Sequence, residues 1–255
     1  MTDQARRVEQ FRALHIPGKP LVLFNIWDAG SAQAVASSGA QAIATSSWSV
    51  ATANGFTDGE RTPLAVAIDN LRRIVGAVQL PVTIDLESGY GDAPEAVGET
   101  VALAIGAGAV GCNLEDSFPA NSKLRETVNQ AERIRAARRA ADAAKLRFFI
   151  NARTDIFFQR SPEQHDDDMI SEAIDRAHAY AADGADGLFA PGLINIVLIA
   201  RLAEALPIPL NIMVGDTTPT LHVLAENGVA RVSHGPGPYI VAMKMLEKAA
   251  RATSV

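Results

Sequence analysis

Eight short apolar runs rich in β-forming residues recur along the chain, and alanine-rich segments with helical periodicity separate them. Because strands that alternate with helices pair in parallel, eight such units in 255 residues predict an α/β fold, a (β/α)8 TIM barrel. No break in composition indicates a linker, so we expect residues 1–255 to form a single domain. A doubly wound open sheet is the alternative. The expected strands cover residues 21–26, 42–47, 82–87, 110–115, 147–153, 186–190, 209–214 and 230–233.

The charge and composition exclude several classes of function. A net charge of −6 argues against nucleic acid as a partner, because proteins that bind a phosphate backbone need a basic surface. No apolar run approaches the roughly 20 residues that span a bilayer, and the N-terminal stretch predicts an amphipathic helix rather than a secretion signal. A single cysteine excludes an internal disulfide and a thiolate zinc cluster. We therefore expect a cytoplasmic protein that binds neither nucleic acid nor a membrane.

Two acids end the third expected strand, in the stretch PVTIDLESGYGD. Residues two apart on a strand point to the same side, so Asp85 and Glu87 share one face while their apolar neighbours pack on helices. The same alternation turns Glu115 inward on the fourth strand and Arg153 inward on the fifth. Polar side chains therefore converge at the carboxyl end of the barrel, where barrel enzymes keep their active sites. The inward faces of these two strands also carry Asn113 and Asn151.

Crowded carboxylates repel one another and need a cation. Oxygen ligands without nearby His or Cys favour a hard ion, Mg²⁺ with Mn²⁺ as a substitute, over zinc. Asp85, Glu87 and Glu115 are therefore the predicted metal site. The planar fork of Arg153 suits a carboxylate or phosphonate of a small anionic substrate. Two structural alternatives stay open, in which Asp85 and Arg153 form a plain ion pair and Asp116 is a solvated loop residue.

Two residues outside this cluster also bear on function. Cys112 alternates with the inward residues of its strand, so we expect it to face the helices as a small buried hydrophobe. His234, in the stretch SHGPGP, follows the eighth strand, where many barrels bind phosphate. It is a candidate substrate contact.

Five motifs occur in one order between about residues 20 and 240: NIWDAGSAQAVASSGAQAIATSS, NGFTDGE, DLESGYGD, GCNLEDS and INARTD. In these motifs the sequence resembles the isocitrate lyase and phosphoenolpyruvate mutase superfamily. The resemblance implies a (β/α)8 barrel, homo-oligomers (commonly tetramers) that exchange the C-terminal helix between subunits, and Mg²⁺ as cofactor. It also implies chemistry in which a pyruvate-type enolate is stabilised while a neighbouring C–C or C–P bond breaks or forms.

The resemblance also assigns roles to residues. Asp85 matches the direct magnesium ligand, Glu87 and Glu115 match acids that hold metal-bound waters, and Asp58 matches an aspartate that completes this shell. Glu87 departs from the more usual aspartate. Arg153 matches the arginine at the substrate's carboxylate or leaving group. The remaining substrate contacts that it implies are Ser46, Ser47, Trp48 and Asn211.

Departures from the family pattern narrow the chemistry. Isocitrate and methylisocitrate lyases carry a K-[KR]-C-G-H loop after strand four, whereas EDSFPANSKLRE contains neither Cys nor His, and LFAPGL lacks their acid after strand six. The loop is instead similar to the F-P-K-x-N-S-L gating loop of phosphoenolpyruvate mutase and phosphonopyruvate hydrolase. This similarity makes Asn121 and Ser122 candidate catalytic residues. Ala120 and Ser117 replace two lysines of that loop, which leaves room for a decarboxylase or a lyase.

The leading hypothesis is a Mg²⁺-dependent enzyme that cleaves or rearranges a C–C or C–P bond beside the pyruvate-type enolate of a small 2-oxo acid or related carboxylate. One alternative is a metal-free sugar-phosphate isomerase that binds phosphate with VGDTTP and SHGPGP. Another is a non-catalytic barrel that binds a 2-oxo acid.

Overall fold

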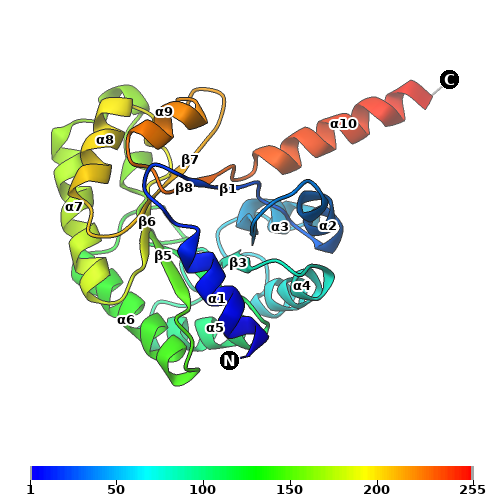
Figure 1. Cartoon of the computed structure of the whole chain (residues 1–255), viewed down its shortest axis with the longest axis horizontal. Coiled ribbons are helices and arrows are strands. Elements are labelled where there is room, and N and C mark those ends of the chain that lie inside the picture. The colour runs from blue at the N-terminus through cyan, green and yellow to red at the C-terminus, as the bar shows by residue number, and fades with distance from the viewer. Residues whose placement is uncertain (1, 254–255) are drawn as a thin grey trace.

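Eight parallel strands form the wall of a barrel, and helices surround it (Figure 1). The computed structural model describes residues 2–253. The strands follow one another around the wall in the order β1-β8-β7-β6-β5-β4-β3-β2, so the predicted (β/α)8 fold is confirmed. Their bounds are β1 (Leu21–Leu23), β2 (Ile43–Ala44), β3 (Val82–Asp85), β4 (Gly111–Glu115), β5 (Phe149–Arg153), β6 (Gly187–Phe189), β7 (Leu210–Met213) and β8 (Arg231–Ser233).

Helices follow the strands, as the alanine-rich segments predict. One of them, α3 (Ser47–Ala53), was not predicted from the sequence; it begins three residues after the end of β2. The α-helices are α1 (Asp3–Ala13), α2 (Ala29–Ser37), α3 (Ser47–Ala53), α4 (Leu64–Ala77), α5 (Pro94–Gly106), α6 (Thr127–Ala143), α7 (Asp167–Ala182), α8 (Ile196–Ala205), α9 (Leu221–Glu226) and α10 (Gly237–Thr253). Two short 3₁₀ helices, η1 (Ile156–Phe158) and η2 (Pro162–Gln164), follow β5.

The barrel closes between β1 and β2 through a single parallel bridge. Ile26, beyond the end of β1, pairs with Thr45, beyond the end of β2. Its amide donates to the Ala44 carbonyl at 2.9 Å, and its carbonyl accepts from the Ser46 amide at 3.1 Å. By contrast, five residue pairs join β4 to β5, from Gly111–Phe149 to Glu115–Arg153.

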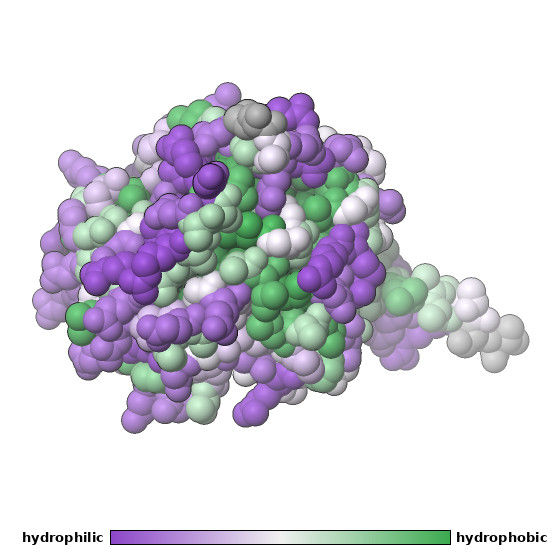
Figure 2. All heavy atoms as spheres, turned by 90° about the horizontal axis from the view of Figure 1, so that it is seen from below, coloured by the Kyte–Doolittle hydropathy of each residue, from purple (hydrophilic) through white to green (hydrophobic). Residues whose placement is uncertain are grey.

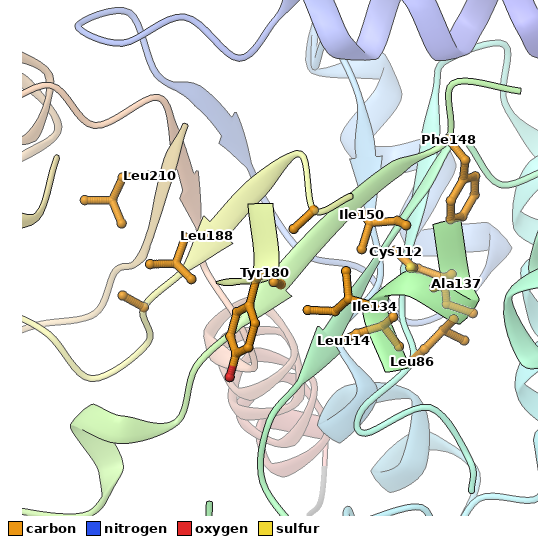
Figure 3. Close-up of a cluster of buried hydrophobic side chains, with 14 of the residues drawn as sticks. Leu86, Cys112, Leu114, Ile134, Ala137, Phe148, Ile150, Tyr180, Leu188 and Leu210 are labelled. Carbon is orange, nitrogen blue, oxygen red and sulfur yellow. The ribbon is translucent and has the colours of Figure 1, made fainter. Parts of the chain in front are cut away.

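The predicted alternation on the strands is confirmed. Apolar residues of β3 and β4 and of the turn after β3 face outward into the core between barrel and helices, where Leu86, Cys112 and Leu114 lie close to Ile134 and Ala137 of α6 (Figure 3). The polar residues face inward. Asn151 donates through Nδ2 to Oδ1 of Asn113 at 2.9 Å inside the barrel.

Helix α1 covers the amino end of the barrel, opposite the predicted site (Figure 1). Its Phe11 packs edge-on against Phe149, the first residue of β5, with ring centroids 5.5 Å apart. His15 stacks on the same ring at 4.1 Å and bonds through Nδ1 to the Phe11 carbonyl at 2.9 Å. Burial, with Arg231 nearby, lowers the pKa of His15 to about 3.

A buried polar network ties the end of β4 to α7. Asp116 is fully buried, so the alternative of a solvated loop residue is wrong. Its carboxylate accepts from Tyr180 Oη at 2.9 Å and from the Asp155 amide at 2.9 Å, and it pairs with Arg176 at 3.3 Å. This network fixes the chain that follows β5, which carries part of the site described below.

Helix α10 projects away from the barrel (Figure 1). In Figure 2 it stands clear of the body of the molecule, with green apolar side chains among the purple ones. Val241, Met245 and Leu246 are each about 60% exposed. Within residues 2–253, no helix is long and apolar enough to cross a membrane.

The buried His15 should make the stability depend on pH. Since its pKa is lowered on folding, the folded state binds fewer protons, and stability is lost as the pH falls below the unfolded value. Between pH 7 and pH 5 this loss should amount to about 2 kcal/mol. Urea unfolding of the wild type and of His15→Gln should show this difference in pH dependence. His178→Gln, at an exposed position of α7, is the matched control, and an equal slope in wild type and His15→Gln would contradict the assignment.

Removing the buried carboxylate of Asp116 should destabilise the fold. Asp116→Ala leaves the Arg176 guanidinium and the Tyr180 hydroxyl without this acceptor, and we expect a loss of about 3 kcal/mol in the free energy of unfolding. Asp92→Ala is the control, because Asp92 also pairs with an arginine, Arg125 at 2.8 Å, but its side chain is 81% exposed. That change should cost less than about 1 kcal/mol. Similar losses in the two variants would argue against a role for the network.

Candidate active site

Two adjoining cavities open at the carboxyl ends of the strands. The central cavity, of about 230 Å³, is lined by residues at or just beyond the ends of all eight strands. The outer cavity, of about 420 Å³, lies beside it and is bounded by the loops that follow β2, β4 and β5. The two share Asp58, Arg153 and Phe158.

The structure brings most of the predicted site residues together around these cavities. The central cavity is lined by Ser46, Ser47, Trp48, Asp58, Asp85 and Arg153. The outer cavity adds Glu87, Glu115 and Ser122.

Three predicted residues lie apart from both linings. Asn121 is exposed, and its Oδ1 accepts from the Lys123 amide at 3.0 Å. Asn211 is buried inside the barrel and accepts from Ser233 Oγ at 3.2 Å. His234 packs on the ring of Phe24, with centroids 5.1 Å apart, and burial lowers its pKa.

The turn after β2 is held by hydroxyl groups. Ser46 is the N-cap of α3, and its Oγ accepts from the amide of Ser49 at 3.4 Å. The Ser47 amide points to Oδ2 of Asp85 at 3.4 Å, and Thr45 Oγ1 accepts from the Asp85 amide at 2.9 Å. The turn therefore places the two serines directly beside the first acid of β3.

The second acid of this stretch holds a neighbouring loop. The Glu87 carboxylate accepts from the amides of Gly59 at 2.8 Å and Glu60 at 2.5 Å. In return, Glu60 Oε1 accepts from Ser88 Oγ and from the Tyr90 amide, both at 2.7 Å. We call this reciprocal pair, Glu60 and Glu87, the glutamate clasp. The clasp fixes the loop that carries Asp58 into both cavities.

The backbone around the clasp is strained. Glu60, Glu87 and Tyr90 have φ values of 59°, 52° and 58°, a left-handed conformation that costs energy in residues other than glycine. Gly89 takes φ 108° without that cost. Gly91 is needed for a different reason, because a Cβ at this position would clash with Ala96 Cβ at 2.6 Å. The turn thus bends sharply while keeping both acids at the mouth.

Arg153 is enclosed by two carboxylates. Its Nη1 lies 2.9 Å from Glu115 Oε2, and its Nε and Nη2 donate to the two oxygens of Asp155 at 2.6 and 3.2 Å. Ser117 Oγ donates to Asp155 at 2.7 Å and lies 3.1 Å from Glu115 Oε1. Burial opposes the charge of Arg153, but Glu115, Asp155 and Asp85 outweigh it and raise the pKa of the guanidinium.

Negative charge is in excess at the mouth. Five carboxylates line the two cavities, those of Asp58, Asp85, Glu87, Glu115 and Asp155, whereas Arg153 is the one cation among the lining residues within 2–253. Burial raises the pKa of Glu87 to about 7, although the amide of Glu60 opposes it. Burial also raises the pKa of Glu115 to about 8 against the effect of Arg153, and burial with the nearby Asp85 raises the pKa of Asp58.

This donor set fits a hard divalent cation held mainly through water. In the described part of the chain, no three His, Cys, Asp or Glu side chains converge as a direct metal cage. Mg²⁺ does not need such a cage, because it keeps several waters and takes one or two carboxylates directly. Asp85 lines the central cavity beside the turn of Ser46 and Ser47 (the serine turn), whose Ser47 amide lies 3.4 Å from its Oδ2, and the other carboxylates line the same two cavities.

Several residues of the site were missed from the sequence. Asp155 shares the inward face of Arg153 by the same two-residue alternation, so the pattern could have identified it. The apolar lining of the central cavity could not be recognised in the sequence, because its members lie on five different elements or loops: Phe158, Phe189, Pro191, Met213 and Pro236.

Arg231 was also not predicted as part of this region. It is 1% exposed, and its Nη2 donates to Asn113 Oδ1 at 3.2 Å beneath the cavity floor.

The loop after β4 folds over the outer cavity. The Phe118 amide donates to the Lys123 carbonyl at 2.9 Å, and the Ser122 amide donates to the Phe118 carbonyl at 2.8 Å, so the loop forms a tight turn. The Arg125 guanidinium lies over the Phe118 ring, 4.0 Å from its centroid. Gln159, just after η1, donates to the Ser122 carbonyl at 3.0 Å. The predicted gating loop therefore rests on the segment that follows β5.

Comparisons with known proteins agree with this geometry. The model of the phosphoenolpyruvate phosphomutase family matches residues 11–254. A crystal structure of a candidate phosphonomutase from Burkholderia cenocepacia superimposes with a TM-score of 0.96 at 55% identity, over 98% of this chain and 100% of that one. An uncharacterized protein of Mycobacterium tuberculosis is 36% identical over 96% of this chain and 88% of its own length. The 2-methylisocitrate lyase of Escherichia coli is 30% identical over 78% of this chain and 70% of its own. The chain therefore belongs to the phosphoenolpyruvate mutase family, within the isocitrate lyase and phosphoenolpyruvate mutase superfamily.

Proposed function

We propose that the protein is a Mg²⁺-dependent enzyme that cleaves or rearranges a C–C or C–P bond next to a pyruvate-type enolate of a small 2-oxo acid or related carboxylate. The observation that carries this proposal is the excess of carboxylates around Arg153 at the mouth of the barrel. Buried acids with raised pKa values are typical of sites that hold a cation or move protons. Family membership supports the same class of chemistry.

Asp85 would hold the metal directly, while Asp58, Glu87 and Glu115 would hold its waters. When bound, Mg²⁺ supplies electrostatic stabilisation of the negative charge that develops on the 2-oxo oxygen. The Ser46 hydroxyl and the amides of the serine turn lie beside Asp85, where they can orient the 2-oxo carboxylate. Mn²⁺ should substitute, since it accepts the same oxygen ligands.

Arg153 would bind the leaving group or a second carboxylate. A guanidinium has five N–H groups in a planar fork. Asp155 occupies Nε and one side of Nη2, and Glu115 lies at Nη1, so N–H groups remain on both terminal nitrogens for a substrate oxygen pair. Asp155 thereby fixes the plane of the fork, and Asp116 fixes Asp155 through its amide at 2.9 Å.

The loop after β4 would act as a lid. Ser122 already lines the outer cavity, and Asn121 lies exposed one residue before it. A small movement of this loop would carry both residues toward the transferred group and exclude water from the reacting carbanion.

The projecting α10 supports a homo-oligomer in which this helix is exchanged between subunits. Its exposed apolar residues have no cover within the described part of the chain, and isolated monomers rarely expose such a patch. We propose a tetramer, as the family resemblance implies.

Activity should depend on the divalent cation and on Asp85. We expect pyruvate release from at least one of oxaloacetate, phosphonopyruvate or a substituted malate in Mg²⁺, and its loss when a chelator is added. Asp85→Asn should lower kcat/KM by about 10³-fold or more, because the developing charge loses its stabilisation. Asp69→Asn, at an exposed aspartate of α4 that pairs with Arg72, is the control.

Spontaneous, metal-promoted decarboxylation must be subtracted in this assay by a reaction without enzyme. Turnover in the chelator, or full turnover in Asp85→Asn, would overturn the proposed mechanism. Stabilisation by 2-oxo acids without any turnover would instead support the non-catalytic alternative.

Charges placed on α10 should disrupt the oligomer. Light scattering of the wild type after gel filtration should give four times the chain mass of 27.0 kDa. The double change Met245→Glu and Leu246→Glu should shift the mass toward the monomer, because burying two carboxylates in an apolar contact is unfavourable. Lys248→Glu changes an exposed charged residue of the same helix and should leave the mass unchanged. A monomeric wild type would contradict the proposal.

A further inference from the structure

A buried arginine lies inside the barrel beneath the central cavity. Arg231 stands on β8 two residues before Ser233, so both side chains face inward, and Ser233 lines the cavity one layer above. Arg231 is 1% exposed, and its Nη2 donates to Asn113 Oδ1 at 3.2 Å. Its Nε and Nη1 have no hydrogen-bond partner within residues 2–253. The charge is therefore buried without a carboxylate bonded to it in this part of the chain.

Keeping such a charge inside the barrel is unfavourable. A buried ion loses its hydration, and only a well-placed partner restores the loss. Burial lowers the pKa of Arg231 to about 9, while Asp85 acts in the opposite direction, so the side chain stays charged at neutral pH. The guanidinium carbon lies 6.0 Å from the centroid of the Phe11 ring, a contact that offsets only part of the cost. An unpaired buried group of this kind needs an explanation, and its one bonded neighbour offers it.

The contact with Arg231 determines which way the amide of Asn113 is turned. An arginine only donates hydrogen bonds, so the atom of Asn113 that faces Nη2 must be its oxygen. Asn151 Nδ2 donates to the same oxygen at 2.9 Å, which uses both lone pairs of Oδ1. Asn113 also lines the central cavity. Its Nδ2 is therefore the group that it presents to a ligand.

Without the arginine, the two asparagines would have no reason to prefer this arrangement. Asn151 is 1% exposed and lies level with Asn113 on the neighbouring strand. The pair would bond equally well from Asn113 Nδ2 to Asn151 Oδ1, because a primary amide carries a donor and an acceptor of nearly the same shape. That alternative would turn the oxygen of Asn113 away from Asn151. Arg231 distinguishes the two arrangements, since it can bond only to an oxygen.

The donor lies next to the acid that would hold the metal. Asn113 pairs in register with Asp85 on β3, and adjacent strands are about 4.8 Å apart, so a ligand oxygen bound beside Asp85 also faces Asn113. Positive groups are scarce around it, because Arg153 is the only cation of the central lining in residues 2–253 and is already paired with Glu115. A neutral donor is therefore valuable for an anionic ligand at this place.

We infer that Asn113 donates a hydrogen bond through Nδ2 to an anionic oxygen of the substrate, and that Arg231 is the positioning residue that keeps this donor turned toward it. The charge of Arg231 also strengthens the bond, because a cation at the amide oxygen polarises the amide and makes its N–H groups better donors. This inference rests on the proposed function and adds a substrate-binding group to the same site.

The test compares two small planar ligands, oxalate and oxamate. Oxamate has an amide in place of one carboxylate, so it offers N–H groups and less charge where oxalate offers only acceptors. Calorimetric titration of each into the protein in Mg²⁺ gives the ratio of the dissociation constant of oxamate to that of oxalate. Mg²⁺ itself favours oxalate in every variant, so the inference concerns the change in this ratio between variants. A loss of stability alone would leave the ratio unchanged.

Asn113→Asp replaces the donor by an acceptor of the same shape and should lower the ratio at least about tenfold, as expected for a lost hydrogen bond to a charged group. Arg231→Met removes the charge and lets the amide pair turn over, so it should lower the ratio at least about fivefold. Arg138→Met is the matched control, because Arg138 donates to the Gly184 carbonyl and to Asp186 at the amino end of β6. It should reduce stability and leave the ratio as in the wild type.

An unchanged ratio in Asn113→Asp would overturn the inference, as would binding of neither ligand to the wild type. An Arg231→Met protein that is less stable but keeps the wild-type ratio would show that Arg231 has only a structural role. If that variant does not fold, Arg231→Gln takes its place, since glutamine accepts as well as donates and should lower the ratio in the same way. An equal fall in Arg138→Met would likewise contradict the assignment.

Failure of the proposed function looks different from failure of this inference. In that case no 2-oxo acid is turned over in Mg²⁺, whereas the ratio of the two dissociation constants still reports which way Asn113 is turned.

Discussion

Burying negative charge at the mouth of the barrel is the constraint on which the arrangement of the site depends. Asp58, Asp85, Glu87 and Glu115 are brought together by backbone alternation on β3 and β4 and by the loop after α3. Three of these acids have a partner that partly compensates the charge: backbone amides for Glu87, the serine turn for Asp85 and Arg153 for Glu115. These neutral dipoles and the single guanidinium leave the pKa values of three of the acids raised. The remaining deficit of positive charge is what a divalent cation would fill.

Arg153 can serve a substrate because other residues determine its orientation. Asp155 takes one edge of the guanidinium, and Asp155 is itself held through its amide by Asp116. Asp116 in turn rests on Tyr180 and Arg176 of α7, on the outside of the barrel. Arg153 is the only cation that lines the two cavities in residues 2–253. Its position thus depends on α7, a helix that does not line either cavity.

The sequence allowed the barrel and its acidic half to be predicted, because both follow from local periodicity. A period of two on a strand settles which way Asp85, Asn113 and Arg153 face, and the structure agrees. The apolar lining of the central cavity could not be predicted, since Phe158, Met213 and Pro236 meet only when distant strands close into a barrel. Helix α3 was missed because its seven residues, SWSVATA, carry β-branched and small residues rather than a helical apolar face. The expected contacts Asn211 and His234 lie outside the cavity linings of the described chain because one is buried within the barrel and the other packs on Phe24.

The single bridge between Ile26 and Thr45 has a mechanical consequence. Elsewhere the wall is held by ladders of hydrogen bonds, up to five residue pairs between β4 and β5, whereas β1 and β2 share one pair. Local opening of a protein occurs first where the fewest hydrogen bonds must break together. That seam adjoins Ser46, whose amide is one of its bonds, while Glu115 and Arg153 stand on the strongest ladder. The site therefore has a compliant side and a rigid side. Transient opening of the barrel between β1 and β2 would widen the site at the serine turn, while Glu115 and Arg153 keep their spacing.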